Sequence, residues 1–199
     1  MRRVRYNVAA SLDGFIAGAD DSYDWIPNDP TVDFAALIAN VDAVLLGRRS
    51  YEIVRDAGGG AGPWPAGSTL YVFSRTLRAE DNPGVTVIDR DAGAAVAAMR
   101  AAEGGDIWLW GGGTLFASLM AARQVDRVEV TVVPVLLGGG VPLFPGDGQR
   151  AALRLESTKR YPSGMVTLAY SVPDAEASAR PLARGSAASV ASPPRSRRP

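Results

Sequence analysis

The stretch best suited to bind an anion is Gly111–Thr114, which lies between an apolar segment and a helix-like pattern. The residues before it, Ile107–Trp110, have the character of a buried strand, and Thr114–Ala122 repeat apolar residues at helical spacing. A strand that ends at glycines and opens a helix leaves unpaired backbone N–H groups at the positive end of the helix dipole. Glycines there let a phosphate approach the main chain without a Cβ in between. The stretch therefore indicates a phosphate site, with a ligand-free turn as the alternative.

A second apolar run ends at Gly47, and Arg48, Arg49 and Ser50 follow in the first turn of a predicted helix. Arginine at a helix N-terminus is unfavourable for the helix dipole, so local stability does not explain the pair. Guanidinium groups match phosphate oxygens, and a hydroxyl can complete the cradle. This cluster predicts a second set of phosphate ligands, with two solvent-exposed arginines as the alternative.

A third strand end carries Ser74 and Arg75, which could hold a further phosphate or a ribose; ordinary turn chemistry is the alternative. In α/β proteins the carboxyl ends of the strands border one crevice, so three such clusters suggest a site for a polyphosphate cofactor. The common glycine fingerprints are absent from the sequence. Phe116 stands where the third glycine of G-x-G-x-x-G would be, and no G-x-x-x-x-G-K-[ST] occurs.

Strand-like runs alternate with helix-like segments over most of the chain, which predicts an α/β fold with helical crossovers. The last strands alternate apolar and polar residues around a turn at 162–164, which predicts a mixed sheet with an antiparallel C-terminal edge. The expected strands are 4–10, 43–46, 69–73, 85–88, 107–110, 127–134, 153–161 and 165–172, and the expected helices are 33–39, 48–54, 92–101 and 114–122.

The chain of 199 residues is expected to form one domain over residues 1–172. Residues 173–199 are rich in Ala, Ser, Arg and Pro and contain few large apolar side chains. Such a segment buries too little surface to offset its ordering entropy, so we expect a disordered tail.

Composition excludes several classes of site. The sequence has no cysteine and no histidine, which removes disulfides, thiolate or histidine metal sites and any histidine base. The formal net charge is zero, which argues against a general attraction to nucleic acid or anionic membranes. No apolar run approaches the roughly 18 residues of a membrane span, and the basic N-terminus lacks the apolar region of a signal peptide. We therefore expect a cytoplasmic protein.

Four segments in order carry a family resemblance: Ala9–Ala17, Leu46–Glu52, Trp110–Leu115 and Pro134–Phe144. Together they resemble the dihydrofolate reductase superfamily, and within it the reductase domain of bacterial riboflavin biosynthesis. The resemblance implies a three-layer α/β/α fold with a mixed, mostly parallel central sheet and an antiparallel C-terminal hairpin. It also implies a small-molecule substrate and, because relatives are often dimers, a homodimer. The zinc deaminase that accompanies some relatives cannot lie in this chain, which lacks its ligands.

NADPH is the cofactor that the resemblance implies, together with hydride transfer and a cis Gly111–Gly112 peptide bond. By position, two apolar residues would face the nicotinamide, and the three strand-end clusters would hold the pyrophosphate and the 2′-phosphate. The implied cofactor residues are Ala9, Ile16, Gly47, Arg48, Arg49, Ser50, Ser74, Arg75, Gly111, Gly112, Gly113, Thr114 and Leu115.

Asp33 is the nearest match to the acid of folate reductases that binds the pterin, so it is the expected catalytic residue, although the spacing from Trp25 is longer here. Its alternative role is to stabilise the first turn of its helix. Asp13 is a competing carboxylate, expected rather to shape a turn. The activity favoured is an NADPH-dependent pyrimidine reduction of the riboflavin type, with dihydrofolate reduction next. An NADPH-binding sensor without turnover and a purely structural dimeric domain are the alternatives from other classes.

Overall fold

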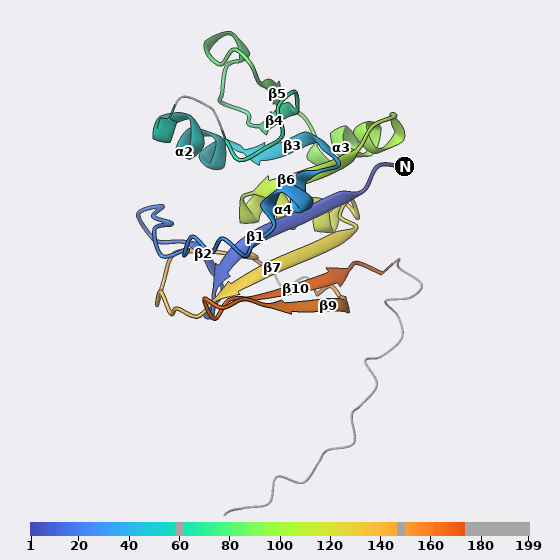
Figure 1. Ribbon diagram of the computed structural model, residues 1–199. Coiled ribbons are helices and arrows are strands. Elements are labelled where there is room, and N and C mark those ends of the chain that lie inside the picture. The colour runs from blue at the N-terminus through green and yellow to red at the C-terminus, as the bar shows by residue number, and fades with distance from the viewer. Residues whose placement is uncertain (59–61, 147–149, 174–199) are drawn as a thin grey trace, which may run out of the picture.

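An eight-stranded mixed sheet organises the computed structural model, which describes residues 1–58, 62–146 and 150–173 (Figure 1). Its order is β5-β4-β3-β6-β1-β7-β10-β9; the first six strands are parallel, and β10 is antiparallel to both its neighbours. The strands of this sheet are β1 (Val4–Ser11), β3 (Val41–Gly47), β4 (Thr69–Phe73), β5 (Thr86–Ile88), β6 (Asp106–Gly111), β7 (Arg127–Val133), β9 (Arg154–Arg160) and β10 (Val166–Ser171).

Helices cover both faces of the parallel part of this sheet. On one face, α3 (Ala92–Ala101) and α4 (Gly113–Ala121) pack Val96, Phe116 and Leu119 against the inward side chains of β1, β6 and β7. On the other, α1 (Phe34–Ile38) and α2 (Arg48–Gly58) pack against β3, β4 and β6. Strands buried on both sides need apolar residues in succession, as β3 shows. The three-layer fold predicted from the sequence is confirmed.

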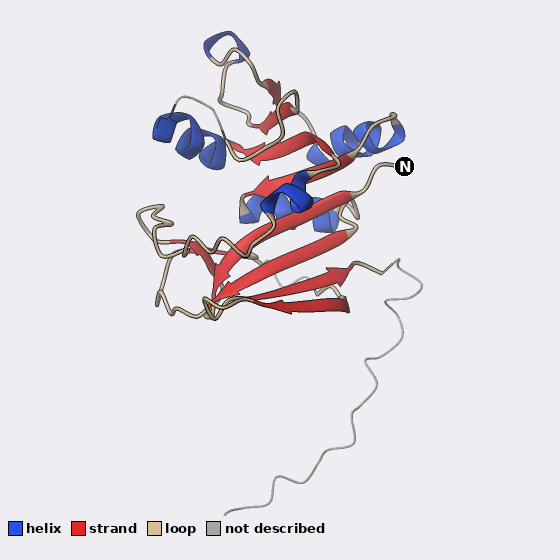
Figure 2. Ribbon diagram, viewed as in Figure 1, coloured by secondary structure: helices blue, strands red, loops and turns tan. Residues whose placement is uncertain are grey.

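The edge formed by β9 and β10 differs from the rest of the sheet. Every residue of β9 is exposed, and Figure 2 shows the described helices gathered away from this edge. Its sequence, Arg-Leu-Glu-Ser-Thr-Lys-Arg, suits that position, because charged residues on an edge strand hinder pairing with other chains.

A small second sheet was not predicted. It pairs β2 (Phe15–Ala17) with β8 (Val141–Pro142), and the chain approaches closely beside it. Gly140 has φ +144°, and a Cβ there would lie 2.1 Å from the carbonyl oxygen of Ala17, so only glycine fits. Strands this short show no alternation of apolar and polar residues, and they pair residues far apart in the sequence, so the second sheet could not be predicted.

The remaining differences from the predicted elements are small. α1 is shorter than predicted, α2 runs on to Gly58, and a short 3-10 helix occupies Ala79–Asp81. The predicted disordered tail, apart from its first residue, lies outside the described residues. None of the helices in the described ranges is long and apolar enough to span a bilayer.

Candidate functional site

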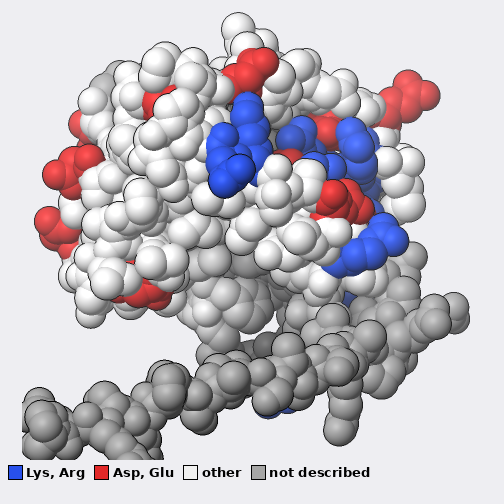
Figure 3. All heavy atoms as spheres, turned by 60° about the horizontal axis from the view of Figure 1, so that its bottom comes forward, with Lys and Arg blue, Asp and Glu red and all other residues white. Residues whose placement is uncertain are grey.

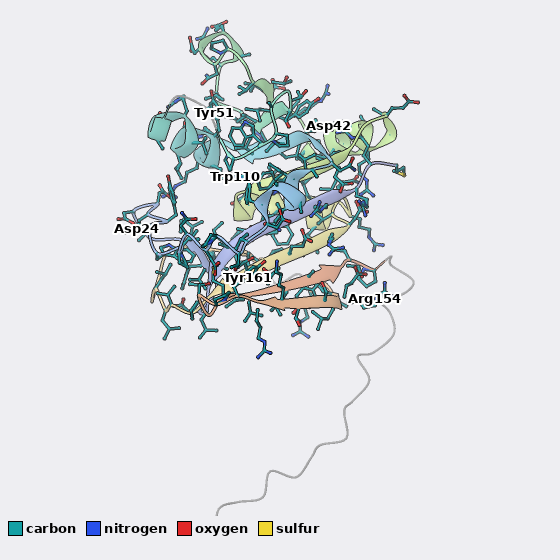
Figure 4. All side chains as sticks on the ribbon, in the orientation of Figure 1. Asp24, Asp42, Tyr51, Trp110, Arg154 and Tyr161 are labelled. Atoms are coloured by element: carbon teal, nitrogen blue, oxygen red, sulfur yellow. The ribbon has the colours of Figure 1, made fainter. Side chains whose placement is uncertain are left out.

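A cleft of about 1690 Å³ opens at the carboxyl ends of the parallel strands. This exceeds the roughly 300–1,000 Å³ typical of a pocket for one small ligand, so it has room for two molecules. In Figure 4 the cleft residues Trp110 and Tyr161 lie toward the carboxyl ends of the parallel strands, while Asp42 and Arg154 lie at the opposite end. The cleft brings together every cofactor residue implied by the sequence: Ala9, Ile16, Gly47, Arg48, Arg49, Ser50, Ser74, Arg75, Gly111, Gly112, Gly113, Thr114 and Leu115.

The N-terminus of α4 faces this cleft. The Gly111–Gly112 peptide bond is cis, as the family resemblance implied, and α4 begins at Gly113 with no side-chain cap on its first turn. The first intrahelical bond is donated by Phe116 N to Gly112 O at 3.0 Å, which leaves the preceding N–H groups for a ligand. At the N-terminus of α3, by contrast, Asp91 accepts a hydrogen bond from Ala94 N at 2.7 Å. The α4 turn is therefore the better anion site of the two.

The turns that begin α2 and α4 lie against each other. A Cβ on Gly47 would be 3.7 Å from Gly112 N, and a Cβ on Gly111 would be 3.2 Å from Ser50 Oγ. The other side of the α4 turn is closed by β8, since a Cβ on Gly113 would lie 2.6 Å from Pro142 O. The first two predicted phosphate clusters, Gly47–Ser50 and Gly111–Gly113, thus form one cradle, and there is little space between the cradle and the protein behind it.

Four arginines line the cleft, and they differ in their partners. Arg48 donates to both carboxylate oxygens of Glu52 at 3.0 Å, and Arg49 forms an ion pair with Asp21 at 2.7 Å. Arg75 and Arg90 are exposed and make no hydrogen bond or ion pair to any residue that the structure describes. They follow β4 and β5, whose ends are joined by a bond from Ser74 N to Ile88 O at 3.0 Å. Arg75 and Arg90 can therefore bind an anion without first giving up a carboxylate.

Ser74 is partly committed to its own turn. Its Oγ accepts hydrogen bonds from Thr76 N at 3.1 Å and Leu77 N at 2.9 Å. This is the turn chemistry considered as the alternative for this cluster. Arg90 was missed by sequence reasoning, although it follows a predicted strand and the same strand-end argument applied to it.

The end of the cleft opposite the four arginines contains a buried carboxylate, which was not predicted from the sequence either. Glu129 on β7 accepts hydrogen bonds from Asn7 Nδ2 at 3.2 Å, Arg5 Nη2 at 3.0 Å and Arg127 Nε at 2.8 Å. Burial would raise the pKa of Glu129, but the bond from Asn7 and the charges of Arg5 and Arg127 outweigh it and lower the pKa. Glu129 is therefore an ionised acceptor at neutral pH.

Asp33 does not join this cleft. It is exposed, it is absent from the lining, and its Oδ1 accepts a hydrogen bond from Ala36 N at 2.9 Å as the N-cap of α1. The predicted catalytic role therefore has no geometric support, and the alternative of a helix-stabilising residue is what the structure describes. The sequence could not separate the two, because an acid in a first turn fits both.

Asp13 also lies outside the cleft lining. Its carboxylate accepts hydrogen bonds from Ser11 Oγ at 2.6 Å, Leu137 N at 3.1 Å and Gly138 N at 2.7 Å. These bonds, led by that from Ser11, lower the pKa of Asp13. Asp13 thus connects two segments that carried the family resemblance, the one after β1 and the one after β7.

Asp29, on the loop before α1, is another carboxylate at the cleft, which Asp21, Asp89 and Asp91 also line. It contacts Ser163 in the turn between β9 and β10 and accepts hydrogen bonds from Thr31 N at 2.9 Å and Thr31 Oγ1 at 2.6 Å. Hydrogen bonds from Ser163 and Thr31 lower the pKa of Asp29 to about 2, so it too is ionised at neutral pH. No three acidic side chains in the described ranges are placed to hold a metal ion together.

Comparison with known proteins identifies the family of this chain. The model of the RibD C-terminal domain matches residues 2–167. The uncharacterized protein YyaP of Bacillus subtilis (strain 168) is 32% identical over 178 residues, which cover 85% of this chain and 94% of that protein.

Solved structures agree with the fold. A putative riboflavin biosynthesis protein from Shewanella sp. PV-4 has a TM-score of 0.73 and 25% identity, covering 87% of this chain and 99% of that one. A deaminase/5-amino-6-(5-phosphoribosylamino)uracil reductase from Thermotoga maritima has a TM-score of 0.65 and 15% identity, over 86% of this chain and 57% of that one. Dihydrofolate reductase from Enterococcus faecalis, complexed with NADP(H), has a TM-score of 0.58 and 18% identity, over 86% and 97%. The chain therefore belongs to the RibD C-terminal domain family, a family of oxidoreductase domains with the fold of dihydrofolate reductase.

Proposed function

We propose that this protein is an NADPH-dependent reductase that transfers a hydride to a small heterocycle of the pyrimidine type. The observation that carries the proposal is the cradle formed by the first turns of α2 and α4, with four arginines along the same cleft. Backbone N–H groups at a helix N-terminus and guanidinium groups are the two donor types that suit a pyrophosphate and a phosphomonoester. The size of the cleft leaves room for a substrate beside the dinucleotide.

Each part of the cofactor has candidate ligands in this arrangement. The α4 turn and Ser50 would hold the pyrophosphate, and Arg75 and Arg90 would hold the 2′-phosphate that distinguishes NADPH from NADH. Arg48 and Arg49 would contribute after exchanging their carboxylate partners. Ala9 and Ile16 line the cleft nearer β1 and would face the nicotinamide.

The bound cofactor would supply the hydride, and the chain would supply position and a water-poor surface. Trp108, which is 3% exposed, and Phe34 form an edge-to-face pair with ring centroids 5.9 Å apart beside the cleft. A planar substrate could stack on the exposed part of the Phe34 ring, which is 39% exposed. Glu129 and Asp29 have lowered pKa values, so neither is a proton donor near neutral pH. The proton that accompanies reduction would then come from water or from the substrate.

Replacing Arg75 by alanine tests the cofactor assignment. The change should raise the Kd of NADPH about tenfold or more, because a hydrogen bond to a charged group contributes about 1.5–3 kcal/mol. The Kd of NADH, which lacks the 2′-phosphate, should stay within about twofold, because the variant removes no other cofactor contact.

The matched control is Arg78→Ala, which removes an exposed arginine paired with Glu80 and outside the cleft lining. It should leave both dissociation constants unchanged. Equal weakening of NADPH and NADH by Arg75→Ala would remove Arg75 from 2′-phosphate recognition. If the unaltered protein bound neither cofactor, the proposed function would be wrong.

A further inference from the structure

The two ends of the cleft present different chemistry. The arginines that line it, Arg48, Arg49, Arg75 and Arg90, all follow β3, β4 or β5. At the other end, on β1, β7 and β10, the lining offers Asn7, Glu129, and a hydroxyl chain. In this chain Thr131 Oγ1 lies 2.7 Å from Thr167 Oγ1, and Thr167 Oγ1 lies 3.4 Å from Tyr161 OH. The second end is therefore built from neutral groups and hydrogen-bond acceptors.

Glu129 fixes the amide of Asn7 in one orientation. Asn7 donates its Nδ2 to Glu129 Oε2 at 3.2 Å, and this bond places the amide nitrogen on the carboxylate side. The amide oxygen of Asn7, a half-buried residue of the cleft lining, is then the group left to meet a ligand. A fixed amide oxygen accepts a hydrogen bond from an N–H group and rejects a second acceptor.

Two aromatic side chains stand beside this acceptor. Trp108 donates its indole N–H to the backbone oxygen of Asn7 at 3.5 Å, and Phe34 packs edge-to-face on Trp108 from α1. Phe34 is 39% exposed and lines the cleft, so part of its ring is free to contact a ligand. An exposed aromatic ring with a hydrogen-bond acceptor near it suits a planar heterocycle that carries N–H groups.

The two arginines that bind Glu129 have carboxylate partners and do not enter the cleft. Arg5 pairs with Asp106 at 3.4 Å and with Glu129, and Arg127 pairs with Glu129 and with Glu156 at 3.6 Å. Neither arginine is part of the cleft lining. Figure 3, which brings the β9 side of Figure 1 forward, shows basic and acidic side chains interspersed on part of this face.

Lys159 and Arg160 on β9 are the remaining basic residues to consider, because they immediately precede Tyr161 in the chain. Arg160 is exposed and is not part of the cleft lining, and the Nζ of Lys159 lies 4.8 Å from the centroid of the Tyr161 ring. Lys159 is also exposed and is not part of the cleft lining, whereas Tyr161 is. A phosphate at this end would have to compete with the ionised Glu129 and Asp29. The surroundings thus disfavour a second dianion in the cleft.

We propose that this end of the cleft recognises an uncharged planar heterocycle through the amide oxygen of Asn7, positioned by Glu129, and selects against a phosphorylated form of the same heterocycle. The proposal rests on the proposed function, because it assigns the other end of the cleft to the cofactor. It makes the proposed substrate more specific. The Thermotoga maritima enzyme is named for a phosphoribosyl substrate, whereas the substrate proposed for this chain carries no phosphate. In this chain Asn7 is a specificity-determining residue and Glu129 a positioning residue.

The test compares 5-amino-6-(ribosylamino)uracil with its 5′-phosphate by calorimetric titration of the intact protein, with and without NADP⁺. The unphosphorylated compound should bind at least about tenfold more tightly, the effect of one ordinary hydrogen bond or of one avoided charge contact. Asn7→Leu should remove about tenfold of that affinity while leaving the Kd of NADPH unchanged, which also shows that the variant is folded. Asn40→Leu, an exposed asparagine outside the cleft lining, is the matched control and should behave as the unaltered protein.

Three outcomes would overturn the proposal: equal or tighter binding of the phosphate, binding of neither compound to protein that binds NADPH, or no effect of Asn7→Leu. If the phosphate binds more tightly and Lys159→Ala removes the preference, Lys159 is the cation that the proposal excludes. Failure of the proposed function gives a different pattern. In that case neither cofactor binds, and the unphosphorylated compound still binds the cofactor-free protein in preference to its phosphate.

Discussion

Replacing Gly113 by alanine would place a Cβ atom 2.6 Å from Pro142 O, 2.7 Å from Pro145 Cδ and 3.2 Å from Leu143 O. Two of these three atoms belong to backbone, so the conflict cannot be relieved by a rotamer change of a flexible side chain. The first turn of α4 must therefore move away from the β8 segment. Overpacking of this kind costs about 1–3 kcal/mol, against a gain of up to about 1 kcal/mol from the better helix propensity of alanine.

We expect Gly113→Ala to lower the free energy of unfolding by about 1–2 kcal/mol in urea denaturation. We also expect the Kd of NADPH to rise about tenfold, which corresponds to about 1.4 kcal/mol, because the displaced turn carries the proposed pyrophosphate donors. The matched control is Gly139→Ala, since a Cβ at Gly139 would meet no heavy atom within 4 Å. Equal stability and equal Kd of the two variants would contradict a close contact between the α4 turn and the β8 segment at the phosphate cradle.

Three further predictions concern carboxylates. Asp33→Ala should lower the free energy of unfolding by about 0.5–2 kcal/mol through loss of the α1 cap, with unchanged turnover in a steady-state assay; a large loss of turnover would restore Asp33 to the mechanism. Glu129→Gln should cost about 1.5–3 kcal/mol at pH 7, because Arg5 and Arg127 lose a charged partner. The pKa of Glu129 is lowered in the folded protein, so the difference in unfolding free energy should be largest above 4.5, the ordinary pKa of a glutamate, and should shrink as the pH falls. A difference that stays constant with pH would contradict an ionised Glu129. Asp29→Asn should lower the free energy of unfolding only above about pH 2, which is the folded pKa of Asp29. The full effect should be present above 3.8, the ordinary pKa of an aspartate. Equal stability of variant and parent at pH 7 would contradict this prediction.

The strands of the main sheet could be predicted from the local pattern of apolar and polar residues. The apolar succession of β3 and the alternation in β10 differ because one strand is buried on both faces and the other lies near an exposed edge. The β2–β8 pair could not be predicted, because three and two residues carry no period and the pairing is set by long-range contacts.

The site was predictable only where it depends on strand ends. Glycine, arginine and hydroxyl residues after β3, β4 and β6 all line one cleft, because parallel strands bring their carboxyl ends to the same edge. Glu129 was not found, since alternation places it and Thr131 on one face of β7 without saying that this face borders the cleft. The role of Asp33 could not be decided from the sequence, because an acid before an apolar helix is equally typical of a cap and of a substrate ligand; in the structure its side chain caps α1.

Paired titrations with NADPH and NADH would show whether the cleft binds NADPH through its phosphates. Trp108 and Trp110 line the cleft, so quenching of tryptophan fluorescence reports occupancy of the intact protein. We expect a micromolar Kd for NADPH and a clear preference over NADH. This preference should weaken as salt is added, because exposed arginines would bind the 2′-phosphate that NADH lacks. Equal affinity for the two cofactors, or no quenching by either with folded protein, would contradict it.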